Sequence, residues 1–296
     1  MKIWLNNIEY TLPSDWPQVP PTSVMGLLRI AHEQPCNERS KLAALRLVNP
    51  IPAKVFNKLL AWQINELVQT FDWLWEHPFE GRPFESFEHK GAVYITPKEK
   101  FGVTTFAEWL TAVVYLFQAY YDTDTPRELS AARLVATLCR PPSDHPTPCH
   151  PDPESVRERG LNLPPDWNGD HRQPFNEHLV ETRAEALLDL PVGILAAVIQ
   201  YFVEELNWLY DTYDVFDDST PQTVRGEPIV QEFDWHERLL GMKNLRYVVA
   251  EENILGNVND VMKANVNDVF DALERLKTKQ NVSSRPRTNY HEDEID

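Results

Sequence analysis

The stretch from Leu190 to Tyr213 reads LPVGILAAVIQYFVEELNWLYDTY, and we take it as the element that decides the fold. Its apolar residues recur at intervals of three and four, which is the spacing of one stripe along an α-helix. The first turns are apolar on the opposite side as well, and Asp189 stands where it can cap the helix. The uncharged run ends after 14 residues, at Val203, whereas a membrane span needs roughly 20. We therefore predict a buried central helix and no membrane span.

The composition is that of an acidic chain with many prolines and few glycines. Its 296 residues carry a net charge of −17, with 24 Pro against 10 Gly. Phosphate binding needs clustered Lys and Arg, so this charge argues against a nucleic-acid partner, and it also disfavours anionic lipid. Three cysteines do not make a disulfide framework, and the N-terminus shows no signal-peptide pattern. We expect a cytoplasmic protein.

Two short segments have the pattern of β-hairpins, each followed by a helix. They cover residues 3–12, turning at Asn6-Asn7, and 87–96, turning at Lys90-Gly91. In both, a Tyr stands three residues before a Pro, and an aromatic residue follows the Pro. The similarity suggests two related hairpin-plus-helix units.

Helical spacing accounts for most of the remaining chain. We expect helices over residues 22–33, 38–48, 53–75 and 235–253, and two more that begin with the capping-box patterns at Thr105 and Thr125. Near the end, Val-Asn-Asp-Val occurs twice, at Val258 and Val266, where an Asn or Asp can cap a helix.

The predicted fold class is therefore mainly α, a helical bundle around the central helix 190–213 with two hairpins at its edge. We divide the chain into four parts: an N-terminal half, a Pro-rich loop or linker, a C-terminal helical half and a disordered tail. Their respective ranges are 1–140, 141–175, 176–280 and 281–296.

The Pro-rich loop contains the residue types that bind zinc, namely Cys139, His145, Cys149 and His150. Their spacing is not that of a zinc finger, because paired C-x2-C or H-x3-H is missing. We expect no metal and no cofactor, and we interpret the loop as solvated, with Cys139 packed at a helix end. The sequence also lacks the phosphate-binding, dinucleotide-binding, nucleophile-elbow and zinc-protease motifs, so we predict that the protein is not an enzyme.

Aromatic residues gather at helix ends and connectors in the C-terminal half. Amphipathic aromatics in such places serve interfaces with helices of other proteins, although most such residues are core or core-edge. The residues that we predict to bind a partner are Trp208, Tyr213, Phe216 and Trp235.

Several segments together resemble tail-assembly chaperones and accessory proteins of tailed bacteriophages, over about residues 87–280. They are the hairpin Phe87–Pro97 with Thr104–Trp109, the helix end Leu134–Pro141, Arg183-Ala184-Glu185 before the central helix, Glu252–Gly256, the doubled Val-Asn-Asp-Val and Leu273–Lys277. The resemblance implies a non-enzymatic, mostly helical protein of the host-cell cytoplasm. Its partner would be an aggregation-prone helical protein such as a tape-measure protein. Two alternatives stay open: a virion structural component such as a connector or baseplate piece, and a metal-binding protein or enzyme that uses the His/Cys loop.

Overall fold

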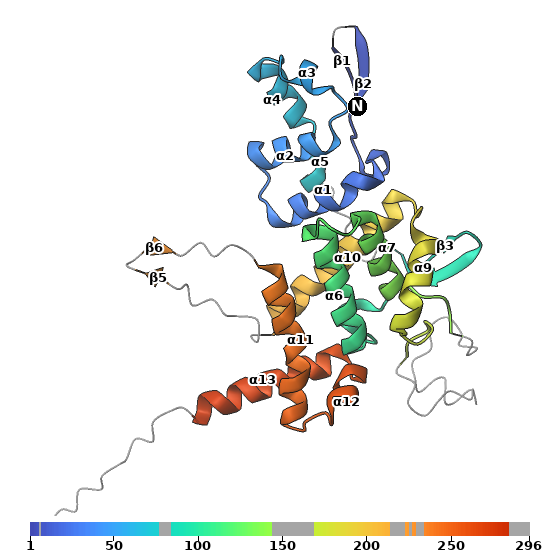
Figure 1. Cartoon of the computed structure of the whole chain (residues 1–296), viewed down its shortest axis with the longest axis vertical. Coiled ribbons are helices and arrows are strands. Elements are labelled where there is room, and N and C mark those ends of the chain that lie inside the picture. The colour runs from blue at the N-terminus through green and yellow to red at the C-terminus, as the bar shows by residue number, and fades with distance from the viewer. Residues whose placement is uncertain are drawn as a thin grey trace, which may run out of the picture.

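The computed structural model describes residues 1–5, 7–76, 84–143, 169–213, 223–224, 227–228 and 234–283. Over these residues the chain is mainly α-helical with short antiparallel hairpins, as predicted (Figure 1). The paired strands are β1 (Lys2–Leu5) with β2 (Ile8–Thr11), β3 (Ser86–His89) with β4 (Ala92–Ile95), and β5 (Thr223–Val224) with β6 (Glu227–Pro228). Lys90 and Gly91 have φ of 50° and 77°, the left-handed conformations that a two-residue hairpin turn requires.

The two predicted hairpin-plus-helix units share one order of elements. The first hairpin leads through a 3-10 turn into two helices, and so does the second. In the first unit these are η1 (Trp16–Gln18), α1 (Pro21–Glu33) and α2 (Glu38–Val48), and in the second η2 (Glu99–Phe101), α6 (Phe106–Tyr121) and α7 (Arg127–Leu138). Both 3-10 turns pack against α10 (Val192–Thr212), so the central helix joins the two units.

Helix α10 confirms the predicted central helix of residues 190–213. Its residues from Leu195 to Val203 are all buried, and it packs against α1 and α7. By length and composition α10 could cross a membrane, but 61% of its most apolar window is buried inside the protein, as in the core helix of a globular protein. It shares the centre with α7, which also contacts α6, α1 and α9 (Val180–Leu187).

The predicted cap of the central helix is wrong. Pro191 occupies the cap position and makes no side-chain capping bond. The Asp189 carboxylate instead lies 3.1 Å from Nε2 of His89 and 2.6 Å from Nζ of Lys90. It therefore ties the turn of the second hairpin to the start of α10, because two potential cations draw the carboxylate away from the helix end.

The single helix predicted over residues 53–75 is broken into three pieces, α3 (Ala53–Phe56), α4 (Ala61–Gln69) and α5 (Trp73–Glu76). Two side chains mark the breaks. Gln63 accepts a hydrogen bond from the backbone N–H of Leu60 (2.9 Å) and starts α4, while the Thr70 hydroxyl donates to the Leu67 carbonyl (2.7 Å) as α4 ends. Leu60, which the spacing placed on the apolar face, is 59% exposed.

Only half of one predicted capping box forms. Thr105 accepts from the Glu108 backbone N–H (3.2 Å), but the Glu108 side chain turns into the core and does not return to the cap. Thr125 does not cap α7, which follows Pro126 and has no side-chain capping bond. Pro126 itself occupies the cap position, with φ −55° and ψ 125°, and its ring disfavours a helical conformation at Thr125.

The last third consists of α11 (Trp235–Glu251), α12 (Val258–Lys263) and α13 (Val266–Ser283), with η3 (Glu177–Leu179) preceding α9 upstream. An Asn before each Val-Asn-Asp-Val copy caps the helix: Asn257 accepts from the N–H of Asn259 (2.8 Å), and Asn265 from that of Asn267 (2.9 Å). Helix α13 extends three residues into the predicted disordered tail, and residues 284–296 lie outside the described part of the chain.

Candidate partner-binding groove

A groove of about 750 Å³ runs between the end of α6 and the first turns of α11. One wall is α6 and the turn that follows it, and the other is α11. The lining residues are Val114, Gln118, Tyr121, Asp122, Thr123 and Asp124 on the first wall and Trp235, His236, Leu239, Leu240 and Lys243 on the second. Its lining mixes apolar side chains with polar ones and with charges of both signs.

The position of α11 follows from one cap and one narrow apolar stripe. Asp234 accepts hydrogen bonds from the backbone N–H groups of His236 (2.9 Å) and Glu237 (3.3 Å), which starts the helix beside α6. Three buried residues, Leu239, Met242 and Val249, hold it against the protein. Trp235, Leu245 and Ala250 are partly buried beside them, and most of the remaining helix surface is exposed.

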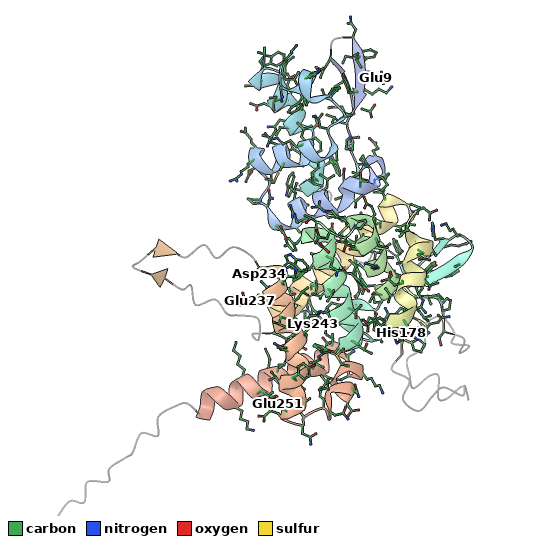
Figure 2. All side chains as sticks on the ribbon, viewed as in Figure 1. Glu9, His178, Asp234, Glu237, Lys243 and Glu251 are labelled. Carbon is green, nitrogen blue, oxygen red and sulfur yellow. The ribbon has the colours of Figure 1, made fainter. Side chains whose placement is uncertain are left out.

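The outward face of α11 carries apolar side chains beyond the groove. Leu240 is 59% exposed, Tyr247 45% and Val248 43%. Residues seven and eight positions apart lie on the same side of a helix, so these three make one line that continues from the groove. Charged residues flank the line, and Figure 2 labels Asp234, Glu237, Lys243 and Glu251 along the same helix. We call Leu240, Tyr247 and Val248 the outer α11 stripe.

Three of the four residues predicted to bind a partner are described by the structure, and of these three only Trp235 lines this groove. Its ring stacks on that of His236, with centroids 3.5 Å apart. Trp208 is half-buried on α10, where the Lys100 ammonium lies 5.6 Å from its ring centroid. Tyr213 is buried and packs on Phe270 in the core (5.5 Å), so its ring is not available to a partner. Phe216 lies outside the described residues.

The weak metal candidates are not brought together over the described part of the chain. Cys139 is fully buried at the end of α7, while His145, Cys149 and His150 fall outside the described residues. Across the residues that the structure does describe, no group of three or more His, Cys, Asp or Glu side chains is placed to hold a metal ion.

A buried cluster of four charged residues was not predicted. The side chains of Glu108, Arg140 and Arg172 are each 1% exposed. Asp170 is the fourth member of the cluster. Glu108 Oε1 lies 2.7 Å from Arg172 Nη1 and 2.8 Å from Arg140 Nη1. Asp170 accepts from Arg140 Nη2 (3.0 Å) and Arg172 Nε (2.8 Å). We call these four residues the charge cluster, and its formal charge is zero.

The electrostatics of the charge cluster favour the ionised form of Asp170. Burial alone raises the pKa of Asp170, but the charges of Arg172 and Arg140 and the hydrogen bonds from Arg172 together hold that pKa below its ordinary value. Burial lowers the pKa of Arg140, whereas the carboxylates outweigh burial at Arg172 and raise its pKa. Because each carboxylate is bound by guanidinium groups, neither is placed to act as a general base.

The charge cluster closes the base of the Pro-rich loop. Arg172 also donates to the Leu138 carbonyl (2.6 Å), and Arg140 to the Gln173 carbonyl (2.7 Å). A backbone hydrogen bond from the Ser143 N–H to the His171 carbonyl (2.8 Å) joins the two chain segments at either end of the loop. No local pattern predicts this arrangement, since Glu108 and Arg172 are 64 residues apart.

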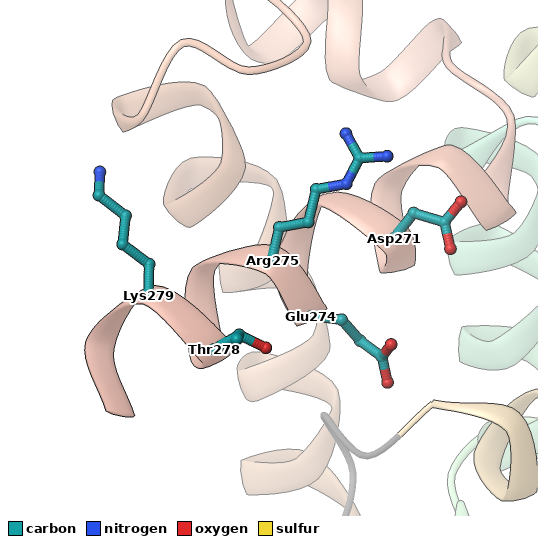
Figure 3. Close-up of a pocket in the computed structure, with 5 residues that line it drawn as sticks. All are labelled: Asp271, Glu274, Arg275, Thr278 and Lys279. Carbon is teal, nitrogen blue, oxygen red and sulfur yellow. The ribbon is translucent and has the colours of Figure 1, made fainter. Parts of the chain in front are cut away.

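A second hollow, of about 610 Å³, lies along α13 (Figure 3). The residues that line it, all on this one helix, are Asp271, Glu274, Arg275, Thr278 and Lys279. Lys279 also pairs with Glu252 (3.5 Å). Since no second element of the described chain contributes a lining group, the described polar groups do not converge there as they do in a substrate site.

No protein-family model, no curated protein and no solved structure matches the chain. Function can therefore be inferred only from the surfaces of the described residues.

Proposed function

We propose that the protein is non-enzymatic and binds an α-helix of another protein along the α6–α11 groove, as a tail-assembly chaperone of the bacteriophage type. The observation that carries the proposal is the outer α11 stripe, three large apolar side chains that are 43% to 59% exposed and continue from the groove. An amphipathic helix laid in such a groove buries its own apolar face against them.

The apolar area supports binding of moderate strength. Burying a large apolar side chain that starts about half exposed contributes about 1 kcal/mol. Leu240, Tyr247, Val248 and the half-buried Trp235 together contribute several kcal/mol, from which the loss of translational and rotational freedom is subtracted. A surface of this size suits reversible binding, which a chaperone needs in order to release its partner.

The charges on the rim favour a partner helix with basic flanks. Asp122 and Asp124 lie at the α6 end of the groove. Backbone N–H donation from Asp124 and a hydrogen bond with Thr125 lower the pKa of Asp122, so it is ionised at neutral pH. The net charge of −17 adds long-range attraction for a basic partner. A long helical protein with apolar stripes, such as a tape-measure protein, has the chemistry that this surface would shield.

The test is co-expression with a tape-measure protein, a long helical protein with apolar stripes. We expect wild-type protein to keep that partner soluble and to bind it directly in calorimetry. Leu240→Glu places a charge in the centre of the apolar line, and we expect it to weaken binding at least tenfold. Val93→Glu is the matched control, because Val93 is 44% exposed on β4, outside the groove. Equal binding by Leu240→Glu and wild type would refute the assignment of the groove.

A second measurement separates a chaperone from a virion component. Mass spectrometry of purified particles should find no stoichiometric amount of the chain if it acts as a chaperone. A fixed number of copies in each particle would instead identify a connector or baseplate piece.

A further inference from the structure

The groove and the outer α11 stripe form one apolar line whose two ends differ in charge. At the start of α11, Asp122 and Asp124 line the groove together with His236. Asp234 caps the helix there, and Glu237 is exposed in its first turn. This end of the line therefore holds four carboxylates, and we call these four residues the acidic end.

The cations beside the acidic end leave it negative. The Arg238 guanidinium packs on an aromatic ring of α10, 5.9 Å from the ring centroid. Arg29 lies 5.8 Å from the ring centroid of Tyr121 and is paired with Glu33 (4.0 Å), so its charge is offset. With His236 counted as neutral, four carboxylates and the Arg238 guanidinium give this end a formal charge of −3.

The other end of the line has the opposite sign. Lys243 lines the groove, and the Arg246 guanidinium lies 4.8 Å from a ring centroid in the outer α11 stripe (Figure 2). Glu251 stands at the end of α11, and Glu252 is paired with Lys279 (3.5 Å). Lys243, Arg246 and Glu251 together give this end a formal charge of +1.

We propose, building on the function proposed above, that the helix bound along this line is charge-polarised and places a basic end against the acidic end. Bound the other way round, the same helix would set its cations against Lys243 and Arg246, and like charges in contact weaken binding. Helices favour Lys and Arg in the last turn and Asp and Glu in the first, where these charges offset the helix dipole. A partner of this kind therefore lies antiparallel to α11. From Trp235 to Val248 the line is about 20 Å long, at about 1.5 Å per residue, which matches about four turns of the partner.

Two synthetic peptides test the polarity by fluorescence anisotropy with the full chain. Both are blocked at their termini, about 20 residues long to span the line, and carry one Leu stripe and equal numbers of Glu and Lys. The polarised peptide has Glu in its first turns and Lys in its last turns, whereas Glu and Lys alternate along the mixed peptide. At low salt the polarised peptide should bind about fivefold more tightly, the size of effect that a few exposed ion pairs produce. The difference should shrink at about 0.5 M NaCl, because salt screens surface charges.

Charge-reversal variants show where the preference arises. Asp124→Lys with Glu237→Lys should abolish the preference for the polarised peptide. Glu88→Lys with Glu185→Lys is the matched control, because it changes the net charge equally at exposed positions of β3 and α9 and should keep the preference. Comparing the same two peptides on each protein cancels any difference in their own helicity, and circular dichroism checks that each variant is folded.

A benzophenone group placed at either end of the polarised peptide tests the direction by photocrosslinking. From the Lys end it should label residues 121–124 or 234–238, and from the Glu end residues 243–251. Equal affinity of the two peptides, a preference that survives Asp124→Lys with Glu237→Lys, or crosslinks in the reverse order would overturn the polarity. The groove itself would then stand as the binding site, provided that Leu240→Glu weakens both peptides. If neither peptide binds, or if Leu240→Glu has no effect on them, the proposed function fails and the polarity fails with it.

Discussion

Replacing Glu108 by Gln should destabilise the protein by roughly 3–5 kcal/mol, because it leaves two buried guanidinium groups with one carboxylate between them. The substitution removes the charge of the Glu108 carboxylate, whose Oε1 lies 2.7 Å from Arg172 Nη1 and 2.8 Å from Arg140 Nη1. All three side chains are 1% exposed. A chain of this size loses about 2–4 °C in Tm for each kcal/mol, so the Tm should fall by about 6–20 °C. Urea denaturation followed by tryptophan fluorescence measures the change.

A double-mutant cycle shows whether the charge cluster acts as a unit. Arg172→Met alone should cost as much as Glu108→Gln, since it leaves the two carboxylates of Glu108 and Asp170 with Arg140 as their one guanidinium partner. The pair Glu108→Gln with Arg172→Met leaves Arg140 facing Asp170 at zero net charge. We expect the double variant to be more stable than the sum of the single changes predicts, by roughly 2 kcal/mol or more.

The matched control is the exposed pair of Arg133 and Glu181, 2.9 Å apart, in which Glu181 is 56% exposed. Glu181→Gln should change stability by less than about 1 kcal/mol, because solvent screens that pair. The reasoning fails if Glu108→Gln is as mild as this control, or if the costs in the cycle simply add.

Three further predictions concern the remaining core and the loop. Burial lowers the pKa of His32 to about 4, although a hydrogen bond with Gln200 acts in the opposite direction. On acidification the unfolded chain therefore binds a proton at a higher pH than the folded chain, so the free energy of unfolding should fall by about 2 kcal/mol between pH 7.5 and pH 5 and continue to fall down to pH 4. His32→Gln should flatten this part of the profile of urea midpoint against pH. Ile199→Asp puts an unpaired charge at a fully buried position and should abolish cooperative melting, whereas an unchanged Tm would mean that α10 is misplaced. Replacing residues 144–168 by about six Gly and Ser should leave the Tm within a few degrees of the wild-type value. The reason is that backbone hydrogen bonds between Ser143 and His171 and between Gln173 and Pro141 already close the base of the loop. Loss of the fold would contradict this.

The spacing of apolar residues correctly predicted helices in which the buried side is the apolar side of the helix's own sequence. The predicted range 38–48 agrees with α2, and the apolar intervals of residues 190–213 agree with α10. The same argument fails over residues 53–75, because the apolar spacing runs on without interruption while Gln63 and Thr70 start and end a helix through single hydrogen bonds. Periodicity reports which side of a helix is apolar, but not whether the helix continues.

Two interactions between residues that are distant in the sequence could not be predicted from it, and both were missed for one physical reason. Asp189 had an adequate local role as a helix cap, but His89 and Lys90, about 100 residues earlier, compete for it. Glu108 likewise had a local role in a capping box, which two buried guanidinium groups outweigh. In both cases a charged partner binds a carboxylate more strongly than a neutral backbone N–H does, and the partner is known only once the chain is folded.

The residues that line the groove were only partly predictable, because aromatic content does not distinguish a core residue from a surface one. Tyr213 and Trp235 look alike in sequence, yet one packs on Phe270 and the other lines the groove. What separates them is how much of each helix the core covers. Helix α11 buries three of its 17 residues, whereas α10 buries eleven of 21. A helix held by so narrow a stripe, yet carrying Leu240, Tyr247 and Val248 on its outer side, gains stability when a second apolar surface covers that side. Binding of a partner helix should therefore slow amide hydrogen exchange in α11 more than in α10, and unchanged exchange in α11 on saturation with the partner would place the binding surface elsewhere.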